Sequence, residues 1–200
     1  MKKLLFTILC CMYLCGCEAN SEINSTTNNN QNSDSKAETK ISKEKTDRIK
    51  ENIERCKALN IEVKISDATV FNPEFEEAFD VVLADVPCSG LGVIGKKQDI
   101  KYRLTTEGLE SLYDLQSKIL ENVSKYVKKG GYLCYSTCTV NKKENEDQAE
   151  KLVSDGRFKY EALNFLPDAF KEKAKGGSLS LMQGVDDSDG FFIAILKKKA

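Results

Sequence analysis

Two short, nearly continuous apolar runs constrain the fold of this chain most strongly. Residues 79–84 (Phe-Asp-Val-Val-Leu-Ala) and residues 132–136 (Tyr-Leu-Cys-Tyr-Ser) have the length and composition of strands that are buried on both faces. Between them, apolar residues recur at helical spacing from Leu109 to Val127, which predicts a long amphipathic helix. Strands that alternate with helices are typical of an open α/β sheet. We therefore predict an α/β fold with a mostly parallel sheet.

Further elements are expected on both sides of this unit. Apolar residues at helical spacing between residues 49 and 59 predict a helix, and the alternation over residues 61–65 predicts a half-buried strand. The apolar run 191–196 predicts a final strand. Asn141 and Glu144 have the spacing of a capping box at the start of another helix.

Residues that can carry chemistry follow three of the predicted strands. Asp67 follows the first strand, Asp85 and then Cys88 follow the second, and Cys138 follows the third. In open α/β sheets, ligands bind beyond the carboxyl ends of the strands. We therefore expect the candidate chemistry to cluster at one edge of the sheet.

Composition excludes several kinds of site. The chain contains no His, which rules out histidine triads and histidine metal sites. A metal site built from Cys88, Cys134 and Cys138 is disfavoured, because Cys134 and Cys138 lack the spacing of a zinc knuckle, and we predict no metal. A disulfide among these cysteines stays open for an exported domain. With 30 basic and 31 acidic residues, any RNA contact must come from a local patch or from a part outside this sequence.

Three motifs in this order resemble the RsmB/Sun-type ribosomal-RNA (cytosine-5) methyltransferases. They are Asp85-Val86-Pro87-Cys88, Ser136-Thr137-Cys138 and Asp189-Gly190-Phe191-Phe192. The resemblance covers residues 41–198 and implies a Rossmann-like fold that uses S-adenosylmethionine. It also implies RNA, specifically the ribosomal RNA of the small subunit, as the partner.

The resemblance also implies a role for each site residue. Cys138 would be the nucleophile that adds to the cytosine ring, and Cys88 would assist proton removal and product release. Asp85 would hydrogen-bond the cytosine edge. Asp67 and Asp85 would contact the cofactor. This is covalent catalysis, in which one difficult step is divided into easier ones.

The chain departs from the family at its cofactor-binding side. The glycine-rich loop of the family, an Ala-Pro-Gly-Gly-Lys type segment, occurs nowhere in the sequence, and neither does the strand before it. We therefore expect a sheet truncated at this side, with the strand 79–84 left as an unpaired apolar edge. We expect the chain alone to be poorly folded and impaired in binding S-adenosylmethionine.

The first 40 residues have a different character. Residues 4–14 form an apolar run after two lysines, shorter than the roughly 20 apolar residues of a membrane-spanning helix. Leu14-Cys15-Gly16-Cys17 resembles a bacterial lipobox, which makes residues 1–17 a signal peptide and Cys17 its lipidated residue. Residues 18–40 are polar and of low complexity, which predicts a disordered linker before a partial catalytic domain at 41–200.

Three interpretations of this combination stay open. In the first, a methyltransferase fragment is joined to an unrelated leader. In the second, a lipid-anchored protein uses the fold remnant as a non-catalytic binding module. In the third, a separate partner supplies the missing loop. The methyltransferase family is expected in the cytoplasm, whereas a functional leader with lipidation at Cys17 predicts a membrane-anchored lipoprotein.

Overall fold

The computed structural model describes residues 34–58, 60–174 and 176–200. The described residues divide into two compact units, one that ends at Asp67 and one that begins at Ala68. The predicted signal peptide, its lipidated Cys17 and the linker up to residue 33 lie outside the described residues.

The first unit contains one long helix, α1 (Asp34–Arg55). It occupies residues 34–40, which we had assigned to the linker, because Lys36, Ala37 and Glu38 favour helix formation. Residues 61–65 form no strand, so that prediction was wrong. Strand backbone is satisfied by hydrogen bonds to a neighbouring strand, and none of the described strands pairs with this segment.

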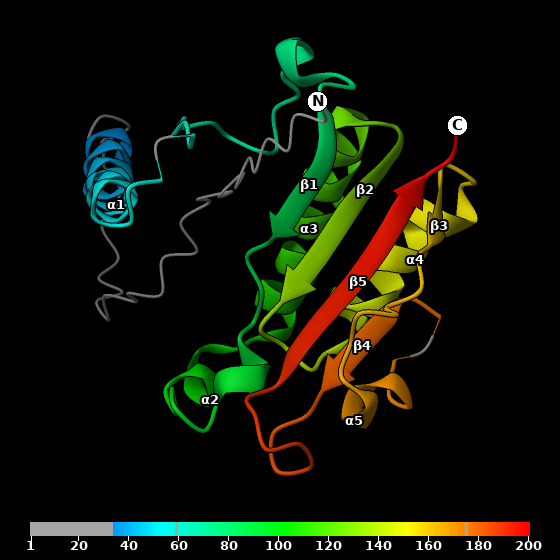
Figure 1. Cartoon of the computed structure of the whole chain (residues 1–200). Helices are drawn as coiled ribbons and strands as arrows, with labels where there is room; N and C mark the ends of the chain where they lie inside the picture. The colour runs from blue at the N-terminus through cyan, green and yellow to red at the C-terminus, as the bar shows by residue number, and fades with distance from the viewer. Residues whose placement is uncertain (1–33, 59, 175) are drawn as a thin grey trace. The chain divides into compact units, whose positions relative to one another are not determined.

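The second unit is built on one sheet of five strands (Figure 1). The order is β1-β2-β5-β3, and β4 also pairs with β5. The strands are β1 (Phe79–Asp85), β2 (Val127–Thr137), β3 (Phe158–Tyr160), β4 (Ser178–Leu181) and β5 (Phe191–Lys198). Among the described strands, β1 pairs only with β2 and so forms an edge, as expected from the truncation.

The α/β class is confirmed, but the sheet is mixed rather than mostly parallel. Among the strands that the structure describes, only β1 and β2 run parallel, whereas β5 runs antiparallel to β2, β3 and β4. A parallel neighbour requires a crossover connection of a dozen or more residues, usually a helix, and α3 (Thr106–Tyr126) supplies it between β1 and β2. The short segment 182–190 joins β4 to β5 and can only reverse the chain.

The two longest helices of this unit, α3 and α4 (Glu146–Ser154), lie on one face of the sheet (Figure 1). The N-terminus of α3 is capped by the Thr105 hydroxyl, which accepts a hydrogen bond from the Gly108 N–H at 3.0 Å. Successive strand residues alternate between this face and the other. The core between helices and sheet therefore consists of fully buried side chains such as Ile119, Val123, Leu133, Tyr135 and Phe192.

Shorter helices lie in the connections. They are η1 (Pro73–Phe75), η2 (Leu91–Val93), α2 (Ile100–Arg103), η3 (Lys142–Glu144) and α5 (Asp168–Lys171). No helix within the described ranges combines the length and the apolar character needed to cross a membrane.

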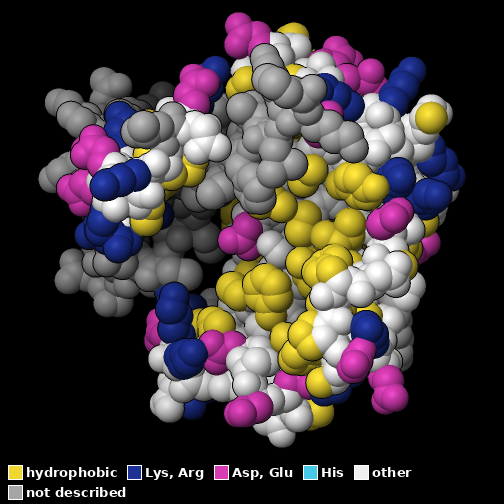
Figure 2. Space-filling view, viewed as in Figure 1, with side chains coloured by type: hydrophobic (Ala, Val, Ile, Leu, Met, Phe, Trp, Pro, Cys, Tyr) yellow, Lys and Arg dark blue, Asp and Glu magenta, His cyan; other side chains and the backbone are white. Residues whose placement is uncertain are grey.

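The opposite face of the sheet is less well covered. Its side chains, among them Val81, Leu83, Tyr132, Ile193 and Ile195, are only half-buried. Hydrophobic side chains gather on this side of the molecule (Figure 2). Side chains on the sheet face under α3 and α4 should therefore contribute more to the free energy of unfolding, per residue, than those on the opposite face.

We expect Leu133→Ala to lower the free energy of unfolding by about 2–5 kcal/mol, because it leaves a cavity in the buried core. Leu83→Ala, on the half-buried face of the adjacent strand, should cost clearly less. Urea unfolding followed by circular dichroism measures both. Equal losses would contradict the assignment of the core to one face.

Candidate active site

The site is built where the two parallel strands end. Asp85 of β1 and Ser136 of β2 are register partners, so the two strands finish side by side. The loop that carries Cys88 and the loop that carries Cys138 therefore leave the sheet at the same place. This confirms the expectation that the chemistry after these two strands shares one edge.

The two thiols meet above this edge. The distance between Cys88 Sγ and Cys138 Sγ is 3.2 Å. A disulfide would bring the sulfur atoms to about 2.05 Å, and both cysteines are free. Both side chains are half-buried, so each retains some access to solvent. The contact is a hydrogen bond between two reduced cysteines.

The proton is shared unequally within this pair. The hydrogen bond from Cys88 is the main cause that lowers the pKa of Cys138 from 9.0 to about 7. Burial and the charge of Asp85 oppose this effect, while the Cys138 backbone N–H and the charge of Lys97 add to it. A substantial fraction of Cys138 is therefore a thiolate at neutral pH.

Cys88 shows the opposite behaviour. The hydrogen bond to Cys138, burial and the charge on Cys138 all raise the pKa of Cys88, and backbone N–H groups of Gly90 and Cys138 only partly offset them. Cys88 therefore keeps its proton and acts as the donor. The pair consists of one nucleophilic sulfur and one sulfur that can donate a proton.

Cys134 provides an internal comparison. It lies on β2, opposite Leu83 of β1 and Ile195 of β5. Burial, followed by the charge of Asp85, raises its pKa to about 11, so it is not nucleophilic at neutral pH. In the part of the chain that the structure describes, no three His, Cys, Asp or Glu residues are grouped so that they could hold a metal ion.

Asp85 places a carboxyl group close enough to Cys138 for its charge to act on that thiol. Its side chain is open to solvent, yet the protein around the strand end partly desolvates it, and this burial raises its pKa above the ordinary value. The Ser136 hydroxyl opposes the shift through a long hydrogen bond of 3.4 Å to Oδ1. Asp85 therefore has capacity to accept further hydrogen bonds.

The third motif, Asp189-Gly190-Phe191-Phe192, docks onto the same loops. The Gly92 N–H donates to the Cys138 carbonyl at 3.1 Å, and the Gly190 N–H donates to the Gly92 carbonyl at 2.7 Å. A Cβ atom on Gly92 would lie 2.1 Å from the Gly190 oxygen, so only glycine fits there. Lys96 and Asp189 form an ion pair at 2.6 Å. The three motifs thus converge on one place.

Sequence reasoning missed the group that connects the two cysteine loops, which is the side chain of Glu144. The predicted capping box was wrong in its second half. Asn141 accepts a hydrogen bond from the Lys143 N–H and caps η3. Glu144, however, is fully buried and accepts a hydrogen bond from the Ser89 N–H. Its i+3 spacing from Asn141 fits both arrangements, so the sequence offered no signal to separate them. Asp67 belongs to the first unit, and its cofactor contact stays a prediction.

Comparison with known proteins decides the family. Residues 27–197 match the family described as 16S rRNA methyltransferase RsmB/F. The chain belongs to this family. The match begins well before residue 41, inside the segment that we had assigned to the linker.

Relatives and solved structures agree with this assignment. The chain is 34% identical over 163 residues to "Probable ribosomal RNA small subunit methyltransferase B" of Bacillus subtilis (strain 168), covering 80% of this chain and 36% of the relative. It is 36% identical over 155 residues to "Ribosomal RNA small subunit methyltransferase F" of Aliivibrio fischeri (strain MJ11), covering 74% and 32%. The RsmB/F chain thus spans about a third of the length of these relatives.

Two solved structures from Pyrococcus horikoshii share the fold. NSun6 with SFG is 27% identical with a TM-score of 0.64, covering 76% of this chain and 38% of that one. A methyltransferase homolog protein is 26% identical with a TM-score of 0.59, covering 76% and 50%. The mixed sheet of this chain is thus part of a Rossmann-like methyltransferase fold.

We expect alkylation of Cys138 by iodoacetamide to be half-maximal near pH 7, because Cys88 stabilises its thiolate. Cys134 should stay unmodified up to about pH 9 in the folded chain. Peptide mass spectrometry across a pH series measures each site. Cys88→Ala should move the Cys138 midpoint upward, whereas Cys134→Ala should leave it in place. A Cys138 midpoint near 9 in the unmodified chain would refute the unequal sharing of the proton.

Proposed function

We propose that this RsmB/F family chain carries the catalytic cysteine pair of an S-adenosylmethionine-dependent ribosomal-RNA methyltransferase that modifies carbon 5 of cytosine. One observation supports this most: the Cys138 sulfur lies 3.2 Å from the Cys88 sulfur, and this contact lowers the pKa of Cys138 and raises the pKa of Cys88. The relatives named above are small-subunit ribosomal-RNA methyltransferases.

The proposed chemistry requires a thiolate. Carbon 5 of cytosine is too weak a nucleophile to take a methyl group directly. When the Cys138 thiolate adds to carbon 6, a new C–S bond forms and carbon 5 becomes electron-rich. The cofactor supplies the electrophilic methyl group that carbon 5 then takes. Loss of the carbon-5 proton and cleavage of the C–S bond restore the aromatic ring and the thiolate.

Cys88 assists the later steps in this proposal. The Cys138 thiolate must leave carbon 6, and a hydrogen bond from the Cys88 S–H stabilises the charge that returns to the leaving sulfur. While Cys138 is bound to the base, its charge no longer holds the Cys88 proton. Cys88 can then lose its own proton to water and take the carbon-5 proton, which restores the S–H that stabilises the leaving Cys138 sulfur.

Asp85 is the proposed contact to the cytosine edge. Its solvent-open carboxyl group, at the end of β1, has acceptor capacity beyond the long bond from Ser136. A hydrogen bond to the base during addition favours the charge that develops on the ring. A target base in folded RNA must be unstacked to reach the thiols.

The residues present fit only part of a cofactor site. Asp85 stands at the carboxyl end of a parallel strand pair, where α/β sheets bind ligands. The glycine-rich loop of the family is missing from this sequence. We therefore propose that Asp85 contacts S-adenosylmethionine, and that tight binding requires a glycine-rich loop that this sequence lacks. The contact of Asp67 with the cofactor stays a prediction.

A local basic patch is the proposed RNA contact. It lies in and before α2 and consists of Lys97 and Lys101, with the exposed ring of Tyr102 beside them. Lys96 and Arg103 border it and are held in ion pairs with Asp189 and Asp99. The Lys101 ammonium group stands 4.8 Å from the centre of this ring. Cations bind phosphates, and an exposed ring can stack on a base. This patch therefore supplies the local RNA contact that a chain with a nearly neutral overall charge requires.

The test joins residues 34–200 to the segment that precedes the matched region in the Bacillus subtilis relative. We expect this chimera to form 5-methylcytosine in small-subunit ribosomal RNA when S-adenosylmethionine is present. Cys138→Ser should lower the rate by about 10³-fold or more, because the nucleophile is lost. Nucleoside mass spectrometry of the RNA measures the product.

Two further variants separate the roles of the cysteines. Cys88→Ala should accumulate a covalent protein–RNA adduct that survives denaturing electrophoresis, because release is slowed. Cys134→Ala should retain the activity of the unmodified chimera, since its thiol is protonated and takes no part. A chimera that leaves cytosine unmodified, or a Cys138→Ser chimera that still methylates at full rate, contradicts the proposal.

A further inference from the structure

The carboxylate of Glu144 is fully buried and receives four hydrogen bonds. Its Oε1 accepts from the Ser89 N–H at 2.8 Å and from Gln116 Nε2 at 3.0 Å. Its Oε2 accepts from the Ser89 hydroxyl at 2.6 Å and from the Thr139 hydroxyl at 3.2 Å. Burial in a low-dielectric interior makes each of these bonds stronger and costlier to lose. The carboxylate is therefore a rigid junction.

The donors that meet at Glu144 are the immediate neighbours of the two cysteines. Ser89 follows Cys88, and Thr139 follows Cys138. Gln116 of α3 also donates to the carbonyl of Pro87, at 2.8 Å, and so fixes the residue before Cys88. Glu144 thus holds both cysteine loops without contacting either thiol.

Asn145, the next residue, bonds to the loop that carries Cys138 and not to the loop that carries Cys88. Its Oδ1 accepts from the Thr137 hydroxyl at 2.5 Å, and its Nδ2 donates to the Thr139 carbonyl at 3.0 Å. These are the residues on either side of Cys138. Like Glu144, Asn145 is buried.

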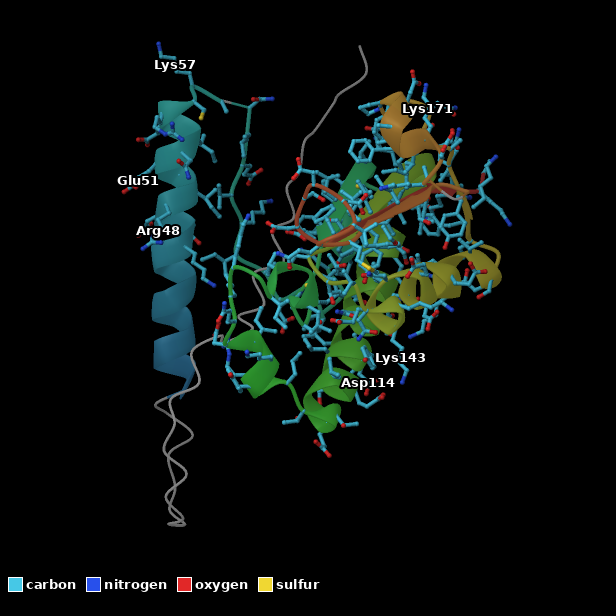
Figure 3. All side chains as sticks on the ribbon, turned by 90° about the horizontal axis from the view of Figure 1, so that it is seen from below. Arg48, Glu51, Lys57, Asp114, Lys143 and Lys171 are labelled. Carbon is cyan, nitrogen blue, oxygen red and sulfur yellow. The ribbon has the colours of Figure 1, made fainter. Side chains whose placement is uncertain are left out.

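The neighbouring residue shows that this burial is specific. Lys143 is exposed, pairs with Glu110 at 3.3 Å and lies on the outside of the molecule (Figure 3). The chain at η3 thus directs one side chain to solvent and the next into the junction. The Tyr135 hydroxyl, which donates to the Glu144 carbonyl, anchors the backbone at this point to β2.

We propose that Glu144 and Asn145 are positioning residues that set the contact between Cys88 and Cys138. The inference deepens the proposed function and rests on it for its catalytic meaning. The groups that stabilise the Cys138 thiolate are Cys88, the backbone and Lys97, and Glu144 is not among them. Glu144 acts by holding Cys88 where it can donate, since a displacement of about 1 Å is enough to weaken such a bond.

The test measures the alkylation midpoint of Cys138 in the full chain with iodoacetamide, for variants whose folding is checked by circular dichroism. Glu144→Leu keeps the volume but removes all four acceptor contacts, and its midpoint should rise from about 7 toward 9, by about one pH unit or more. Glu144→Gln should stay near 7. Its amide oxygen accepts from Ser89 N–H and Gln116, and its amide nitrogen donates to the hydroxyls of Ser89 and Thr139, which can rotate.

Val123→Ala is the matched control, because it removes buried volume from α3 and leaves the junction intact. Its midpoint should not move. A folded Glu144→Leu variant with a midpoint still near 7, or a Val123→Ala shift of the same size, would overturn the positioning role. If Glu144→Leu does not fold, Ser89→Ala and Asn145→Ala decide: a raised midpoint supports the inference and an unchanged one refutes it.

These outcomes are separable from the proposed function. An unchanged midpoint in every junction variant, together with a chimera that depends on Cys138, removes the role of Glu144 and leaves the methyltransferase proposal standing. A chimera that fails to methylate, together with a raised midpoint in Glu144→Leu, contradicts the methyltransferase proposal and leaves the positioning role of Glu144 standing.

Discussion

The hydrogen bond between the Cys88 and Cys138 sulfur atoms is the interaction on which the rest of this site depends. At 3.2 Å it lowers the pKa of the Cys138 thiol to about 7 and keeps the Cys88 thiol protonated. Neither sulfur would behave this way alone, because the main cause of each pKa shift is the other sulfur. The fold serves this contact by ending two parallel strands in register and letting their loops leave the sheet together.

The contact between sulfurs is weak, so its geometry must be fixed by stronger bonds around it. Backbone bonds through Gly92 link the two loops to the Asp189-Gly190 turn. The buried carboxylate of Glu144 links the same loops from the side of α3. Buried polar groups are costly unless every partner is present, and four donors provide those partners here. The polar junction and the apolar core beneath it are therefore parts of one arrangement.

The sequence predicted the elements whose signals are local and strong. The runs that became β1, β2 and β5 and the helix that became α3 were all predicted, and so was the meeting of Cys88 and Cys138. The prediction of a strand at 61–65 was wrong, because a segment with alternating apolar residues forms a strand only where a neighbouring strand pairs with it. The direction of β5 depends on the short connection from β4, a strand that was not predicted. Glu144 was misassigned to a helix cap because a capping residue and a buried residue can both stand three positions after Asn141. The contact of Asp67 with a cofactor stays a prediction.

The proximity of the two thiols can be measured directly. Diamide takes one hydrogen from each of two neighbouring thiols and joins their sulfurs, and peptide mapping of the oxidised full chain identifies the residues joined. We predict that a disulfide between Cys88 and Cys138 forms at a low diamide concentration, while Cys134 stays a free thiol. If Cys88 and Cys138 remain unpaired while other cysteines oxidise, or if each joins a different partner, the central claim is contradicted.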